Sequence, residues 1–145
     1  MKVGTMTPRQ IRLVRHSFEA ASPRRELLSA SFFADLFARD PSLRRLFDGD
    51  LAARGAELYY GLAAIVASLG RLHAFLPALE WLAIRYGRRG VGAPQYAAIG
   101  EALRTTLARG LGEAFTAEHR EARAAAQLLV AGLMIRALED EPLAA

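Results

Sequence analysis

The chain lacks cysteine and is poor in the other side chains that usually bind metals. Its 145 residues contain no cysteine, a single lysine and three scattered histidines, His16, His73 and His119. Without cysteine, a disulfide scaffold, a zinc–thiolate site, a cysteine nucleophile and a thiolate ligand to iron are all excluded. Three scattered histidines leave little room for a metal site built from several imidazoles. The sequence therefore offers few groups for metal or covalent chemistry.

A long uninterrupted apolar run is also missing. The longest stretch, residues 124–135, is interrupted by Gln127 and is far shorter than the roughly 20 residues that a membrane span needs. No apolar core of a signal peptide follows the single basic residue at the N-terminus, Lys2. We therefore expect a cytoplasmic protein that does not interact with membranes.

Apolar residues and arginines are abundant instead. The chain is 52% hydrophobic and 23% charged, with a net charge of +4. This composition excludes a disordered chain, and the length suits one domain spanning residues 1–145. The basic cluster Arg85, Arg88 and Arg89 falls at a predicted helix end, which is typical of a solvated face. Without the signature of a recognition helix, we do not expect nucleic-acid binding.

Start and stop signals predict helices along the whole chain. Thr7 and Pro8 followed by Gln10 form a capping-box pattern, while Ser22-Pro23 and Asp40-Pro41 give further starts. Apolar residues recur at helical spacing, and no alternating strand pattern of useful length occurs. The sequence thus predicts an all-α domain with helices at residues 7–20, 23–39, 41–47, 51–69, 75–87, 94–110 and 116–139.

The order of these elements is similar to a known family. Residues 35–47 resemble the end of helix B through helix C of bacterial globins, in the single-domain and flavohaemoglobin-like branch. Residues 47–51 resemble that branch's loop into helix E, and residues 94–103 and 107–116 resemble its helix G and GH corner. The resemblance extends over about residues 7–138. It implies a globin fold, a three-over-three helical sandwich of about seven helices around haem b.

The resemblance also assigns roles to individual residues. Phe47 matches the phenylalanine that packs on the haem face, and Phe33 falls where helix B contributes to the distal pocket. Leu58 occupies the apolar distal position of helix E, and Arg54, one turn earlier, replaces the distal Gln or His. The whole set that the resemblance implies for the cofactor comprises Phe33, Phe47, Arg54, Leu58, Leu82, Tyr86, Val91 and Tyr96.

The main departure from the family lies at the proximal ligand. Relatives carry a histidine ten residues before the helix G tyrosine, which is Tyr96 here, and this spacing falls on Tyr86. None of the three histidines is expected to replace it: His73 falls in the turn before the predicted fifth helix, and His16 and His119 are expected to face outward or cap a helix end. The acidic residue that supports the proximal histidine falls at Leu138. Glu57 stands where relatives often carry a basic residue for a haem propionate.

Two interpretations of Tyr86 follow. In the first, its phenolate is the metal ligand to ferric haem, the ligand type that catalases use. Arg89, three residues further on, is expected on the same helical face, where its charge stabilises the phenolate. A phenolate favours Fe(III), so this site suits binding or sensing of a gas, peroxide or anion rather than O2 storage. Arg54 offers a donor to such a ligand. Peroxidase-like chemistry is compatible with it, although no dedicated catalytic motif occurs.

In the second interpretation the pocket holds no haem. Tyr86 is then a packing residue, and the globin fold serves as a sensor or protein-interaction module. The altered positions favour this interpretation, whereas the retained Phe33, Phe47, Leu58 and Tyr96 favour haem. Because the sequence contains no reductase domain, any electron donor or signalling partner is expected to be a separate protein, and a second copy of the chain is a further candidate partner.

Overall fold

The computed structural model describes residues 6–140, and these residues form only helices and connecting turns. Six α-helices and four short 3-10 helices occur, in the order α1 (Pro8–Ala21), η1 (Ser22–Arg24), α2 (Arg25–Arg39), η2 (Pro41–Arg45), α3 (Leu51–Ser68), η3 (Leu69–Arg71), α4 (Leu72–Gly87), α5 (Ala93–Leu111), η4 (Gly112–Ala114) and α6 (Ala117–Glu139). The expected all-α class is thus confirmed.

The capping signals at Thr7 and Asp40 work as predicted, whereas the hydroxyl of Ser22 caps no helix and pairs with that of Tyr59 at 2.6 Å. The Thr7 hydroxyl accepts a hydrogen bond from the Gln10 backbone, and the Gln10 side chain accepts one from the Thr7 backbone. Asp40 likewise caps η2 by accepting from the backbone of Ser42 at 3.1 Å. These bonds satisfy amide groups that the first turn of a helix leaves without partners.

Two predicted boundaries need correction. The predicted helix 41–47 is a 3-10 helix that ends at Arg45, so Phe47 lies in the following turn. The predicted helix 75–87 begins three residues earlier, at Leu72, and it accommodates Pro77 in its second turn. No capping signal marks the true start, because Arg71 at the N-cap makes no side-chain cap hydrogen bond.

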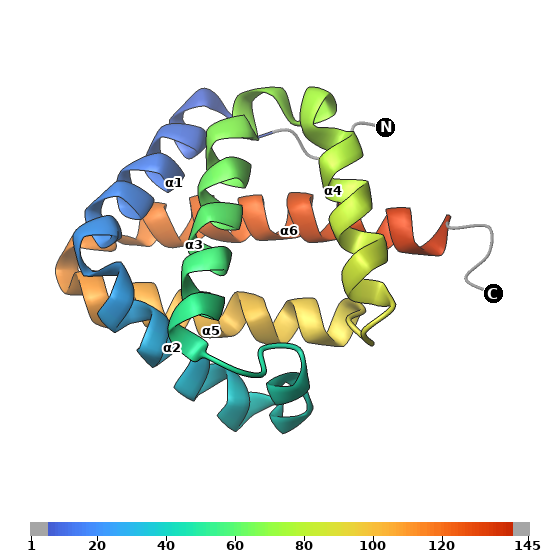
Figure 1. Cartoon of the computed structure of the whole chain (residues 1–145). Helices are drawn as coiled ribbons and strands as arrows, with labels where there is room; N and C mark the ends of the chain where they lie inside the picture. The colour runs from blue at the N-terminus through green and yellow to red at the C-terminus, as the bar shows by residue number, and fades with distance from the viewer. Residues whose placement is uncertain (1–5, 141–145) are drawn as a thin grey trace.

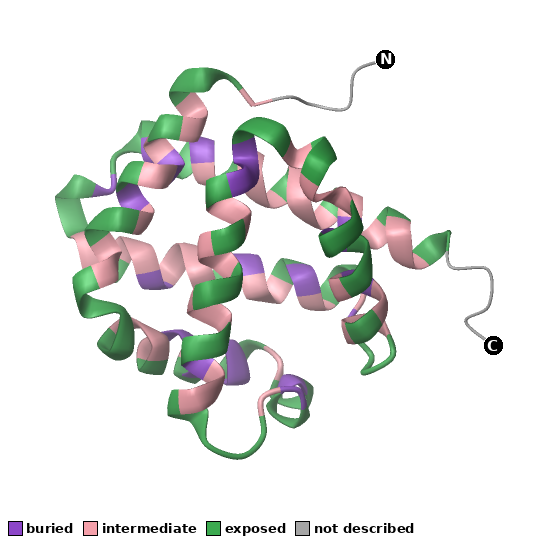
Figure 2. Cartoon of the chain, turned by 45° about the horizontal axis from the view of Figure 1, so that its top comes forward, coloured by how far each residue is buried: buried purple, intermediate pink, exposed green. Residues whose placement is uncertain are grey.

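The helices pack in crossed layers (Figure 1). α2 packs along α5, α6 packs against both α1 and α4, and α3 crosses in front of α5 and α6 while contacting α2. The largest fully buried side chains come from α2, α4 and the turn after η4: Phe32, Leu36, Leu79 and Phe115. Figure 2 shows that α3 and α4 are mainly half-buried or exposed. In α3 only Gly55 and Ser68 are buried.

The segment Leu51–Gly87 is, by length and composition alone, apolar enough to cross a membrane, although only 17% of its most apolar window is buried. It does not form one uninterrupted apolar run in the sequence, because single charged residues such as Arg71 divide it. In the structure the chain turns at η3, so that α3 and α4 are two separate helices (Figure 1). Core helices of other proteins that pass the same test are mostly buried, unlike this segment, and a single apolar segment is weak evidence for a membrane span.

Candidate functional site

The structure brings most of the predicted site residues together. Seven of the eight belong to the larger hydrophobic core cluster of the described residues, to which α2, η2 and the turn after it, α3, α4, the turn after α4, α5 and α6 all contribute. Phe33, Val91 and Tyr96 are buried at its centre. The half-buried members at its edge are Phe47, Leu58, Leu82 and Tyr86. The eighth residue, Arg54, lies on α3 one turn before Leu58.

Three phenylalanines fix one side of this cluster. The ring centroids of Phe33 and Phe47 are 5.0 Å apart, and those of Phe33 and Phe37 are 5.7 Å apart. These separations are typical of favourable aromatic pairs. The Arg44 guanidinium covers the outer face of Phe37, 4.8 Å from the ring centroid. Phe47 is therefore held by contacts from α2, although it lies outside regular secondary structure.

Tyr86 occupies the last turn of α4. Its backbone carbonyl accepts hydrogen bonds from the backbone amides of Arg89 and Val91, at 2.9 and 3.1 Å. Gly90, with a φ of +92°, lets the chain reverse direction after the helix. These contacts fix the backbone of Tyr86, while its half-buried side chain packs against the cluster.

The sequence predicted Arg89 on the helical face of Tyr86, but Arg89 does not lie on the same helix. α4 ends at Gly87, and Arg89 belongs to the turn formed by residues 88–90. The Arg89 guanidinium makes a long contact of 3.5 Å to the carbonyl of Leu46. Arg89 therefore links the end of α4 to the segment that carries Phe47.

Tyr96 lies close to Tyr86 and differs from it in exposure. Its hydroxyl is buried and has no hydrogen-bond partner among residues 6–140. Burial, and secondarily the charge that Tyr86 would carry, raise the pKa of Tyr96 to about 12. The side-chain amide of Gln127 donates to the backbone carbonyl of Tyr96 at 3.1 Å, which ties this residue to α6. Tyr96 consequently stays a neutral phenol at every physiological pH.

Leu138 packs against the end of α4, beside Tyr86. A Cβ added to Gly87 would overlap the Leu138 side chain, so the two helices approach closely only because Gly87 has none. The register placed Leu138 where relatives have a supporting acid, and an apolar contact is found there. Glu139, one residue further on, is exposed.

Arg54 lies on α3, where its charge is only partly neutralised. One terminal nitrogen is 3.3 Å from a carboxylate oxygen of Glu57, in an ion pair whose partners are both partly exposed. Its Nε is buried and has no partner within the part of the chain that the structure describes. A partly exposed pair of this kind contributes little to stability. Glu57, which stands where relatives often carry a basic residue, is thus the counter-ion of Arg54.

Comparison with known proteins agrees with this arrangement. The model of one protein family, described as Globin, matches residues 30–133. The chain belongs to the globin family. It is also 29% identical over 133 residues to the flavohemoproteins of Bordetella parapertussis and Bordetella bronchiseptica, and the match covers 90% of this chain. The chain spans about a third of the length of these relatives, since the match covers 33% of each. The expected all-α globin fold is confirmed.

The histidines of this globin match our expectations only in part. His73 lies in the first turn of α4, exposed, rather than in the turn before that helix. His119 does cap α6, but it is buried, with only 7% of its surface exposed, and Nε2 lies 3.1 Å from Nδ1 of His16. Capping a helix end is one of the two expected roles, so this expectation is met, and the added finding is that α1 covers His119. Within residues 6–140, no group of three histidine or acidic side chains could hold a metal ion.

Two features of this globin escaped sequence reasoning. The sequence indicates Gly87 only as the end of the predicted helix 75–87, because nothing in it links Gly87 to Leu138, 51 positions further on. A cavity on another side of α3 was also missed, together with the polar residues Thr106 and Arg123 that line it. Both features depend on contacts between distant helices, and a helical period alone carries no signal for them.

Proposed function

We propose that this globin binds haem b next to α3 and α4, with the Tyr86 phenolate as the proximal ligand of ferric iron. The observation that carries the proposal is the position of Tyr86: a half-buried phenol at the end of α4, on the same apolar cluster as Phe47, Leu58 and Leu82. We further propose that the site binds or senses a gas, a peroxide or an anion rather than storing O2.

The residues present fit such a group in their chemistry. The site is lined by apolar phenylalanine, leucine and valine side chains, and several of them are only partly buried by the rest of the protein. The buried hydroxyl of Tyr96 and the buried Nε of Arg54 have no partners among residues 6–140. Buried polar groups without partners are rare in folded proteins, and one explanation is a group that the protein alone does not supply.

Tyr86 is a better candidate for the iron than Tyr96. A phenol binds iron as its phenolate, and burial opposes that form at Tyr96, whose pKa is about 12. When bound, ferric haem supplies the positive charge that stabilises a phenolate. Leu138 suits this assignment as well, because an acid at that position would repel a phenolate, whereas it would favour a histidine ligand.

Arg54 of α3 is proposed to contact the small ligand, whereas Tyr86 of α4 is proposed to contact the iron. Its guanidinium has donors beyond the one that contacts Glu57. Charge-assisted bonds to an anion or a peroxide are stronger than neutral ones. Arg54 would therefore bind and orient an anionic ligand, with the apolar Leu58 next to it excluding water.

The remaining roles are drawn from the family. The matched relatives are named flavohemoproteins, and this chain covers only a third of their length. We propose that any electrons or signals pass to or from a separate reductase or signalling protein, and that the protein works in the cytoplasm of a bacterium. A second copy of the chain remains a candidate partner, and peroxidase-like activity is the enzymatic form that a ferric site of this kind would take.

Titration with ferric haem b tests the proposal. Purified protein is expected to bind one equivalent and to give a Soret band that differs from that of free haem. Tyr86→Phe removes only the hydroxyl, so it should abolish or shift this band while leaving the fold intact. Tyr60→Phe, which changes an exposed tyrosine of α3 outside the site, is the matched control and should keep the wild-type spectrum. A band that Tyr86→Phe leaves unchanged would refute ligation by Tyr86.

A haem-free sensor or interaction module is the second candidate. The observation that favours it is the apolar packing around the site: Leu138 fills the position of the supporting acid, and Glu57 already neutralises Arg54 in part. This alternative predicts that the wild-type protein gives no Soret band at stoichiometric haem.

A further inference from the structure

His16 of α1 and His119 of α6 lie in contact where the first and last helices pack together. His16 Nδ1 lies 3.1 Å from His119 Nε2, and the centroids of the two imidazole rings are 5.3 Å apart. An ion pair between Arg9 and Glu118, at 2.8 Å, joins the same two helices. The haem proposal assigns no role to this histidine pair.

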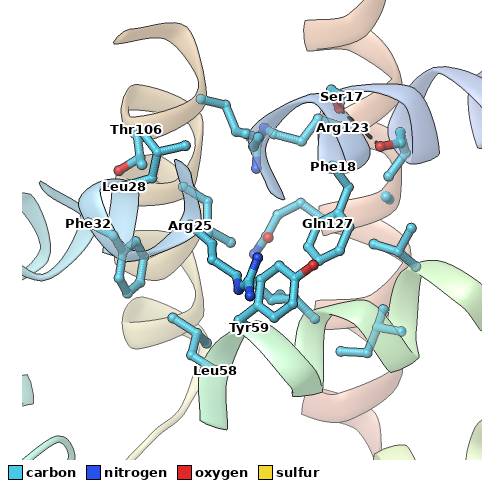
Figure 3. A pocket seen from close by; sticks show the side chains of 18 of the residues that line it. Ser17, Phe18, Arg25, Leu28, Phe32, Leu58, Tyr59, Thr106, Arg123 and Gln127 are labelled. Carbon is cyan, nitrogen blue, oxygen red and sulfur yellow. Dashed lines mark hydrogen bonds between the residues drawn. The ribbon is translucent and has the colours of Figure 1, made fainter. Parts of the chain in front are cut away.

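The histidine pair is separate from the cavity of about 190 Å³ among α1, α2, α3, α5 and α6 (Figure 3). Ser17, which follows His16 in α1, lines that cavity, as does Arg123, one turn after His119 in α6. Neither histidine lines it. His119 is buried, whereas His16 is exposed, so a solute can reach the pair from the side of His16.

The separation of the two nitrogens suits two ligands of one metal ion. Zinc–nitrogen bonds of about 2.0–2.1 Å place two imidazole nitrogens of a tetrahedral site about 3.3 Å apart. The separation of 3.1 Å between His16 Nδ1 and His119 Nε2 is close to that value. Without a metal, the same two nitrogens share one hydrogen bond. Because His16 is exposed, its ring has room to turn when a metal ion replaces the shared proton.

Thr116 holds the ring of His119 from its other side. Its hydroxyl oxygen lies 2.7 Å from Nδ1, and its backbone amide donates to that nitrogen at 3.2 Å. The ring proton of the metal-free pair is therefore on Nε2, which donates to His16. When Nε2 binds a metal ion, this proton moves to Nδ1, which then donates to the Thr116 hydroxyl. Histidines that bind metals usually donate their other ring N–H to an oxygen in this way.

The surroundings leave the pair free to bind a cation. Histidine binds metal ions as the neutral imidazole, and burial favours that form at His119. The charged neighbours of His119 in the sequence are engaged elsewhere: Glu118 binds Arg9, and Arg120 donates to a backbone carbonyl at 3.1 Å. Within residues 6–140, no third histidine or acid completes a larger metal-binding group. Water from the exposed side would therefore fill the remaining ligand positions.

We propose that His16 and His119 together bind one divalent transition-metal ion that favours imidazole, with Zn²⁺ as the probe. His16 Nδ1 and His119 Nε2 are the protein ligands, and water completes the coordination. The ion joins α1 to α6 and stabilises the folded chain. Binding requires no haem, because neither histidine belongs to the cluster around Tyr86.

Calorimetric titration of the untagged full chain with Zn²⁺ at pH 7 tests the proposal. One equivalent should bind, whereas Mg²⁺, which prefers oxygen ligands, should not. Loss of a group that merely supports a ligand typically weakens metal binding about 10–100-fold, so His16→Gln should weaken zinc binding at least about tenfold. His16 is exposed, so this variant should fold. His73→Gln, which changes an exposed histidine of α4, is the matched control and should bind Zn²⁺ like wild type.

Two further measurements locate the ion. A ligand that binds only the folded protein stabilises it, so Zn²⁺ should raise the midpoint of thermal unfolding of wild type and of His73→Gln, but not of His16→Gln. In nuclear magnetic resonance spectra, Zn²⁺ should shift the ring resonances of His16 and His119 together and leave those of His73 in place. Tyr86→Phe should bind Zn²⁺ like wild type, which separates this test from that of the haem proposal.

Three results would overturn the proposal. The first is the absence of zinc binding by wild type. The second is zinc binding that His16→Gln leaves unchanged, and the third is a set of resonance shifts confined to His73.

Discussion

Side chains between α2 and α5 are buried more completely than the side chains of α3 and α4. α2 buries Phe32, Phe33, Leu36 and Phe37, and α5 buries Tyr96 and Ala102. α3 and α4 leave most of their apolar side chains half-buried, and Trp81 is 59% exposed. Buried polar atoms without a partner among the described residues occur in both regions, at Arg54 of α3 and at Tyr96 and Thr106 of α5. The first region, however, buries its apolar side chains almost completely, whereas the second leaves apolar surface half-buried or exposed. We therefore assign chemistry to the second region.

The largest expected effect is on the free energy of unfolding, and it comes from comparing one leucine of each region. Leu36→Ala empties a fully buried position, so it should lower the free energy of unfolding by about 2–5 kcal/mol. Leu82→Ala removes a half-buried side chain and should cost less than half as much in the absence of haem. Urea denaturation with and without haem measures both, and haem should narrow the difference between them. Equal losses without haem would contradict the contrast.

The next effect concerns the contact between α4 and α6. Gly87→Ala places a Cβ against Leu138, so it should destabilise the protein by about 1–3 kcal/mol. Adding Leu138→Ala to that variant should recover much of this loss. Gly61→Ala is the control on α3: no atom lies within 4 Å of its Cβ, and the residue is in a helix interior, so it should stabilise by about 0.5–1 kcal/mol. Losses of the same size for Gly87→Ala and Gly61→Ala would disprove the close approach.

A smaller effect separates the two tyrosines. Tyr96→Phe removes a buried hydroxyl without a partner, so the haem-free protein should gain about 1 kcal/mol of stability. Tyr86→Phe should change the stability of the haem-free protein by less than about 0.5 kcal/mol, since its side chain is only half-buried. Thermal or urea unfolding of the haem-free variants gives the comparison. A clear loss of stability in Tyr96→Phe would show that its hydroxyl has a partner.

The smallest effect is a pH dependence away from the site, between α1 and α6. Burial, and secondarily the neighbouring His16, lower the pKa of His119 below its usual 6.5. The unfolded chain therefore takes up the proton first, so stability is constant above about pH 7 and falls as the pH decreases below 6.5 towards the folded-state pKa. Protonation also removes the Nδ1 lone pair that accepts from the Thr116 backbone at 3.2 Å.

His119→Gln should flatten this part of the curve of stability against pH. His73→Gln, which changes an exposed histidine, should leave it unaltered. A slope that persists in His119→Gln would assign the titration to another group.

The sequence predicted the helices well where local chemistry marks their ends. Thr7 and Asp40 cap helices as expected, because side-chain capping depends on neighbours in the sequence. The apolar members of the candidate site also gather as expected, because the family register carries long-range information. The assignment of Tyr86 to iron follows from that register and remains a prediction.

The errors concern residues whose positions depend on where a helix ends or on contacts between distant segments of the chain. Arg89 lies off the predicted helical face because α4 ends two residues before it. The burial of His119 was not predicted because the helix that covers it, α1, lies about a hundred residues earlier in the chain. Periodicity indicates which face of a helix is buried, but it does not show which side chains lie opposite. The cavity beside Arg123 requires five helices to be placed at once, so no local pattern could predict it.

The most direct test of the central claim is the absorption spectrum of the protein with one equivalent of ferric haem b, compared among wild type, Tyr86→Phe and Tyr86→His. The account predicts a Soret band in wild type, its loss or displacement in Tyr86→Phe, and a different band in Tyr86→His that persists on reduction to ferrous iron. An identical spectrum for wild type and Tyr86→Phe, or no Soret band in wild type, would contradict it.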